Sequence, residues 1–99
     1  MARAPFGPMQ GGTVSISAST TSADEAIAVG QHQLHVANPT SAVAFVRTGR
    51  GATAATAADF PVLPGTDRII SIQPSHDMAA VILSAGTGTV YVTPGTGGI

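Results

Sequence analysis

Two stretches decide the fold class, MAAVILS at residues 78–84 and TVYVT at residues 89–93. In the second stretch Val90 and Val92 alternate with polar or aromatic neighbours, a pattern typical of a strand with one buried face. The first stretch is apolar on both faces. It is therefore either a central strand between two layers or a strand whose second face another subunit covers. The glycine-rich connection 86–88 is predicted to be a hairpin loop.

The same two-residue period extends outward from these stretches to Thr13. Polar residues 20–25 are predicted to turn the chain, Asn38-Pro39 to end a strand, and Pro94-Gly95 to begin a glycine-rich tail. Residues 42–48 are again apolar on both faces. Turn signals recur roughly every ten residues, which predicts an all-β antiparallel β-sandwich of seven to eight short strands, jelly-roll-like or Ig-like. The predicted core consists of Val14, Ile16, Ile27, Val29, Leu34, Val36, Phe45, Ile70, Ile72, Ile82, Val90 and Val92.

Composition excludes several classes of function. The chain of 99 residues fits one domain and has no cysteine, which excludes disulfides and thiolate metal sites. It has four arginines and no lysine, and its net charge is −1, which argues against nucleic acid as a partner. We find no apolar run of about 18 residues and no secretory signal, so we expect no membrane contact and synthesis in the cytoplasm.

The chain divides into an arm and a domain. Residues 1–12 contain two prolines and three glycines, which disfavour regular structure, and we predict an extended N-terminal arm there. Residues 13–99 form the single β-sandwich domain. We expect the arm to be mobile in the isolated protein and to become ordered only through contact with other chains.

No motif predicts catalysis or a cofactor. Ser75-His76-Asp77 holds the residue types of a hydrolase triad, but consecutive residues cannot converge as a triad requires, and we interpret them as a turn. His32 and His35 would face opposite sides of a strand and cannot share a metal ion. The glycines at 86–88 precede a strand, whereas phosphate-binding loops precede a helix. We expect no catalytic, metal or cofactor-binding residues.

Four segments follow one another in a recognisable order: HVANP at 35–39, AFVR at 44–47, ATAADFPVLPG at 55–65 and GTGTVYVTPG at 86–95. This succession resembles small β-sandwich proteins encoded among the structural genes of tailed bacteriophages. The resemblance implies a virion component, either a capsid cement (decoration) protein or a head or tail accessory protein. It implies a binding role and no enzymatic activity.

The expected function follows from that resemblance. We expect a homotrimeric decoration protein on the capsid surface of the virion, which binds the major capsid protein of a phage head and bridges neighbouring subunits. The expected contact residues are Arg3, Phe6, Met9, Arg47 and Arg50. The alternative is a head, neck or tail accessory protein or a carbohydrate-binding virion module. For a sugar site Tyr91, the one aromatic residue predicted to point outward, is a poor platform by itself.

Overall fold

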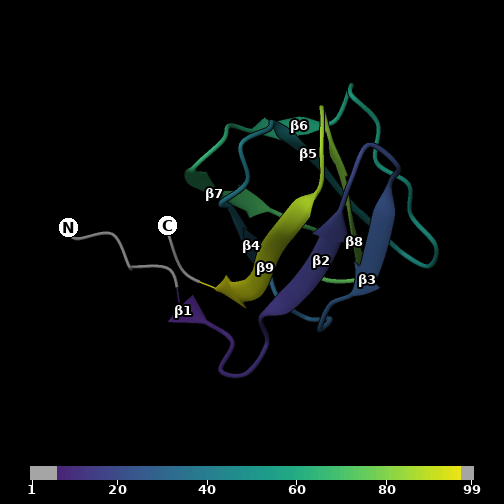
Figure 1. The fold of residues 1–99 in the computed structure, drawn as a ribbon. Helices are drawn as coiled ribbons and strands as arrows, with labels where there is room; N and C mark the ends of the chain where they lie inside the picture. Colours follow the sequence, from purple (N-terminus) through teal and green to yellow (C-terminus); the bar gives the residue numbers. More distant parts are fainter. Residues whose placement is uncertain (1–6, 97–99) are drawn as a thin grey trace.

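Nine strands and no helix make up residues 7–96, the part of the chain that the computed structural model describes (Figure 1). In chain order they are β1 (Gly7–Pro8), β2 (Val14–Ala18), β3 (Ala23–Ala26), β4 (Gln33–Asn38), β5 (Ala44–Gly49), β6 (Phe60–Val62), β7 (Thr66–Ser71), β8 (Met78–Leu83) and β9 (Gly88–Thr96). All pairings are antiparallel. The predicted all-β sandwich is confirmed.

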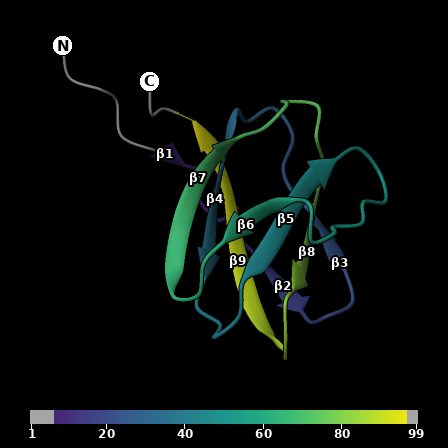
Figure 2. The same cartoon turned by 90° about the horizontal axis from the view of Figure 1, so that it is seen from above.

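The strand order identifies the topology as a jelly roll. Sheet A has the order β2-β9-β4-β7, and β1 also pairs with β9. Sheet B has the order β3-β8-β5-β6. Four antiparallel pairs are thus nested along the chain, β2 with β9, β3 with β8, β4 with β7 and β5 with β6. Two facing sheets built in this way form a jelly roll rather than an immunoglobulin fold (Figure 2).

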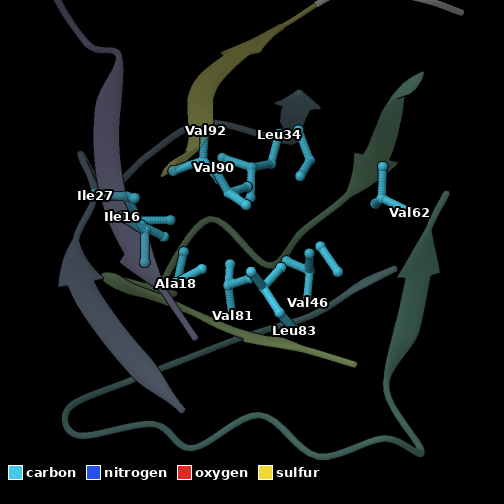
Figure 3. Close-up of a cluster of buried hydrophobic side chains, with 13 residues drawn as sticks. Ile16, Ala18, Ile27, Leu34, Val46, Val62, Val81, Leu83, Val90 and Val92 are labelled. Carbon is cyan, nitrogen blue, oxygen red and sulfur yellow. The ribbon is translucent and has the colours of Figure 1, made fainter. Parts of the chain in front are cut away.

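Branched aliphatic side chains from both sheets fill the space between them (Figure 3). β2, β4 and β9 bury alternate residues, as their sequence period predicts. Six predicted core residues are buried, and Val14, Ile70 and Ile72 pack against them while partly exposed. The six are Ile16, Ile27, Leu34, Val36, Val90 and Val92.

Three core predictions are wrong. Val29 lies in the loop before β4 and is 58% exposed. Phe45 and Ile82 are cross-strand partners that face away from the core, because their neighbours Ala44 and Leu83 face inward. In a strand that is apolar on both faces, the sequence does not indicate which face is buried. An error of one residue then assigns every side chain to the wrong face of the strand.

The prediction of a hairpin loop at residues 86–88 is also wrong. β8 belongs to sheet B and β9 to sheet A, so this connection crosses from one sheet to the other. Gly86 has φ +68°, which lets the chain turn there. A Cβ on Gly88 would lie 2.5 Å from Thr40 Cγ2. The glycine at position 88 therefore serves close packing, not ligand binding.

Two segments predicted to be irregular are strands. β3 lies within the predicted turn, and its Asp24 carboxylate accepts a hydrogen bond from the Thr53 N–H. β9 continues through Pro94 to Thr96, beyond the predicted start of the tail. Its extension is flanked by β1 and β4, and the Pro94 carbonyl accepts a hydrogen bond from Met9. Pairing with distant strands therefore overrode the local turn signals in both segments.

The chain itself covers part of the outer face of sheet B. Ala80 belongs to that face, between Asp24 on β3 and Arg47 on β5, and yet it is fully buried. The β5–β6 loop, residues 50–59, crosses this region and buries Ala55. The Ala55 N–H donates to Ser22 Oγ at 2.8 Å. The loop thus supplies a second layer over β8, one of the strands whose sequence is apolar on both faces.

Candidate functional site

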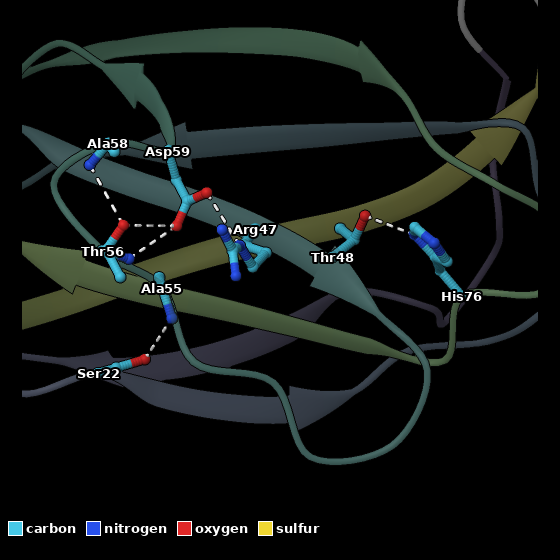
Figure 4. A network of polar contacts seen from close by, with 8 residues as sticks. All are labelled: Ser22, Arg47, Thr48, Ala55, Thr56, Ala58, Asp59 and His76. Carbon is cyan, nitrogen blue, oxygen red and sulfur yellow. Dashed lines mark hydrogen bonds and ion pairs between the residues drawn. The ribbon is translucent and has the colours of Figure 1, made fainter.

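The Ser75-His76-Asp77 segment forms contacts that hold a turn. The His76 N–H donates to the Gln73 carbonyl, and its Nδ1 is hydrogen-bonded to Thr48 Oγ1 at 2.8 Å (Figure 4). Asp77 Oδ1 accepts the Gly51 N–H at 2.9 Å. These bonds tie the β7–β8 connection to β5 and its loop. The His76 and Asp77 side chains are directed to different structural partners, which agrees with the interpretation as a turn.

His32 and His35 lie in different surroundings. His35 lies on the outer face of sheet A, where its Nε2 is 2.7 Å from Asp67 Oδ2, and His32 precedes β4. Within residues 7–96, no group of three or more histidine, cysteine or acidic side chains is placed to hold a metal ion. No helix in that range is long and apolar enough to cross a membrane.

The structure describes three of the five expected contact residues. Met9 is 38% exposed, Arg50 is exposed in the β5–β6 loop, and the Arg47 side chain is 51% exposed. Arg3 and Phe6 lie outside the described residues. Met9 follows β1 of sheet A, whereas Arg47 lies on β5 of sheet B and Arg50 directly follows that strand.

The described part of the predicted arm pairs with its own domain. Gly7 and Pro8 form β1 opposite Thr96 and Gly95, and the Met9 N–H donates to Pro94 at 2.9 Å. The expectation that only other chains could order this segment is therefore wrong for residues 7–9. The physical reason is that β9 is longer than β2 and leaves backbone groups at its end for β1 to pair with.

Arg47 and Asp59 fasten the β5–β6 loop to sheet B (Figure 4). Arg47 Nε donates to Asp59 Oδ1 at 2.9 Å, and Asp59 Oδ2 accepts the Thr56 N–H at 2.7 Å. Burial by itself raises the pKa of Asp59. The Thr56 hydrogen bond and the Arg47 guanidinium outweigh that effect and hold the pKa below its usual value. Arg47 thus has a structural role that the sequence did not predict.

The edge strands on the open side of the sandwich carry three exposed apolar residues, which the sequence did not predict and which we call the apolar rim. They are Phe60 on β6, Leu63 in the β6–β7 connection and Ile69 on β7, which lies opposite His35 on the outer face of sheet A. Their exposed fractions are 43%, 51% and 49%. β6 and β7 are the edge strands of the two sheets on this side (Figure 2). The rim therefore joins exposed apolar area to unpaired strand edges, a combination typical of contact surfaces.

A hollow on the outer face of sheet A is a second feature that the sequence did not predict. It measures about 480 Å³ and is lined by His35, Ala37, Asn38, Pro39, Gly65, Thr66 and Asp67. His35 lowers the pKa of Asp67 through a hydrogen bond and its charge. Asn38 is 1% exposed, and its amide donates to the Ala42 and Val62 carbonyls, so it supports the wall of the hollow from inside. β4 and β7, which form the hollow, are distant in sequence, and no local motif marks it.

The chain matches no protein-family profile and no curated protein. It is similar to a solved structure described as "Bacillus endospore appendages form a novel family of disulfide-linked pili". The similarity has a TM-score of 0.50 at 15% sequence identity and covers 94% of this chain and 87% of the other. At this identity the similarity shows the fold, a small all-β sandwich.

Proposed function

We propose that this protein is a structural component of an assembled particle, a decoration protein that binds a phage capsid lattice and bridges neighbouring subunits. The observation that carries the proposal is the apolar rim of Phe60, Leu63 and Ile69 along two strand edges. Such a surface loses exposed apolar area and gains backbone hydrogen bonds when a partner covers it. The phage resemblance of residues 34–93 supports the identity of the particle.

A structural role is also consistent with the polar contacts of the domain. The triad-like segment and the Arg47–Asp59 pair hold loops together, so the proposed mechanism uses no catalytic residue and no cofactor. The solved structure of similar fold is a pilus, itself an assembly. Its title describes disulfide-linked subunits, whereas this chain has no cysteine. Contacts between copies would therefore rest on non-covalent packing.

The proposal includes self-association, with a trimer about a lattice axis as the expected form. The rim of one copy has a small area. The loss of translational and rotational freedom on association costs roughly 4–15 kcal/mol, which the contacts must exceed before any net affinity appears. Linking copies makes each further contact intramolecular, at an effective concentration near millimolar. A trimer would in this way convert several weak contacts into stable bridging.

Particle rupture tests the proposal. Capsids are prepared without the protein, with the wild type, and with a rim variant carrying Phe60→Ser, Leu63→Ser and Ile69→Thr. We expect the wild type to raise the temperature of capsid rupture and the rim variant to leave it at the undecorated value. A folded rim variant that protects as well as the wild type would overturn the role of the rim. Equal rupture with and without the wild-type protein would overturn the decoration function.

The N-terminal arm needs a separate deletion. Removing residues 1–12 would also remove β1 and its pairing with β9, so binding and stability would change together. Removing residues 1–6 deletes Arg3 and Phe6 and leaves that pairing intact. We expect the shorter deletion to weaken capsid binding without lowering the melting temperature. Unchanged binding would show that these two residues do not contact the partner.

A further inference from the structure

The outer face of sheet A carries a row of three side chains in register across three strands. Tyr91 on β9 lies directly opposite Ala37 on β4, and Ala37 lies directly opposite Asp67 on β7. Adjacent strands are about 4.8 Å apart, so Tyr91 and Asp67 stand about 10 Å apart across the small Ala37. This gap opens into the hollow of about 480 Å³, within the range of small-molecule sites.

Tyr91 lies at one side of this gap, in register with Ala37. It is 42% exposed, and its two cross-strand neighbours are Ser15 and Ala37. Both neighbours are small, so they leave much of the ring uncovered. An exposed ring beside polar groups offers an apolar face and a hydroxyl to the same ligand. The strand pairing thus reveals small neighbours on both sides of Tyr91, which the sequence alone did not show.

The opposite side of the gap offers a fixed carboxylate. His35 Nε2 contacts Asp67 Oδ2 at 2.7 Å and orients the carboxyl group, while the Asp67 side chain stays 67% exposed. A carboxylate accepts hydrogen bonds from hydroxyl groups and repels anions. The next residue, Arg68, lies in register with the inward-facing Val36, and the hydrogen bond and charge of His35 together with the charge of Arg68 lower the pKa of Asp67. The exposed carboxylate can accept hydrogen bonds from the hydroxyl groups of a neutral polyol.

We propose that the gap between Tyr91 and Asp67 binds a single pyranose unit of a neutral carbohydrate. The sugar would stack one face on the Tyr91 ring, rest over Ala37, and donate hydroxyl hydrogen bonds to the Asp67 carboxylate. Thr66 and Gly65 bound the hollow at its end, and the φ of +68° at Gly65 shapes the tight turn there. This binding activity does not depend on the proposed decoration function.

Titration of the isotopically labelled chain with methyl glucoside, methyl galactoside, methyl mannoside and methyl N-acetylglucosaminide tests this site by NMR. We expect saturable shifts centred on Ala37, Thr66 and Tyr91 for at least one sugar, with a Kd on the order of millimolar. Tyr91→Ala should weaken binding by about 10-fold, whereas the matched control Tyr91→Phe, which keeps the ring, should bind within about 2-fold of wild type.

A second variant guards against a loss of folding. Ala37→Leu fills the floor of the gap on an outer face, and it should abolish the shifts while the rest of the spectrum stays native. A variant that carries only Phe60→Ser and Leu63→Ser leaves Ile69 unchanged opposite His35 and should bind sugar like wild type, which separates this test from that of the decoration function. Absence of shifts with all four sugars at about 50 mM, well above a millimolar Kd, would overturn the proposal. Shifts that persist in folded Ala37→Leu protein would overturn it as well.

Discussion

Arg47 Nε and Asp59 Oδ1, separated by 2.9 Å, connect the central strand β5 to the far end of the loop that follows it. The contact closes the β5–β6 loop over the outer face of sheet B, where Ala55 and Ala80 are buried. The loop thereby covers a surface for which the sequence had left open coverage by another subunit.

Removing the Asp59 carboxylate should therefore loosen this loop. Asp59→Ala removes acceptors from both Arg47 and the Thr56 N–H, and we expect it to lower the free energy of unfolding by about 1–2 kcal/mol. Arg47→Ala, at a side chain that is half exposed, should lower it by less than about 1 kcal/mol. The control Arg50→Ala, in the same loop, should change little. Urea unfolding measures all three, and an Arg50→Ala effect as large as that of Asp59→Ala would contradict this account.

The buried face of β8 can be tested with two neighbouring residues. Leu83 is 2% exposed and faces the core, whereas Ile82 faces outward and is half-buried. Leu83→Ala should lower the free energy of unfolding by about 2–5 kcal/mol, and Ile82→Ala by about 1 kcal/mol. Thermal unfolding of the two variants provides the comparison. The reverse order would mean that β8 has the opposite face buried.

Asn38 should be intolerant of both polar and apolar replacement. Its amide donates to the Ala42 and Val62 carbonyls, and its Oδ1 accepts hydrogen bonds from Thr40. Asn38→Ala should lower the free energy of unfolding by about 2–4 kcal/mol, because the two carbonyl groups and the Thr40 donors lose their hydrogen-bond partner. Asn38→Asp should be at least as damaging, since a carboxylate cannot donate to carbonyls. Chemical denaturation measures both, and a neutral Asn38→Asp variant would refute the assigned bonds.

Acid should destabilise the fold through two carboxylates. The pKa values of Asp59 and Asp67 are both lowered in the folded state. Each carboxylate therefore contributes stability that is present above its unfolded pKa of about 3.9 and is lost as the pH falls through the folded pKa. We expect the urea concentration at the unfolding midpoint to decrease as the pH is lowered below about 4. This decrease should be less steep in the double variant Asp59→Asn, Asp67→Asn. An unchanged slope in that variant would assign acid unfolding to other groups.

Sequence patterns predicted the strands that have one buried face and failed where both faces are apolar. β2, β4 and β9 alternate clearly, so their inward residues and the outward Tyr91 were predicted correctly. For β5 and β8 the pattern left the choice open, and Phe45 and Ile82 were wrongly placed in the core. Only the pairing of distant strands determines which face is covered.

The candidate sites depend even more on distant pairing. The gap over Ala37 exists because β9 and β7 bring Tyr91 and Asp67 to its two sides. The apolar rim exists because β6 and β7 are both edge strands. Neither relationship follows from spacing along the chain, whereas the expected arm and arginines were chosen from local composition alone.

Counting the copies of this protein bound to purified capsids shows whether it decorates a capsid through the apolar rim. Capsids assembled without the protein are incubated with wild type or with the Phe60, Leu63 and Ile69 rim variant, separated from free protein by sedimentation, and quantified by mass spectrometry. The account predicts saturable binding of wild type at a fixed ratio to the major capsid protein, and little binding of the folded rim variant. No wild-type protein on the capsids, or equal saturation by the rim variant, would contradict it.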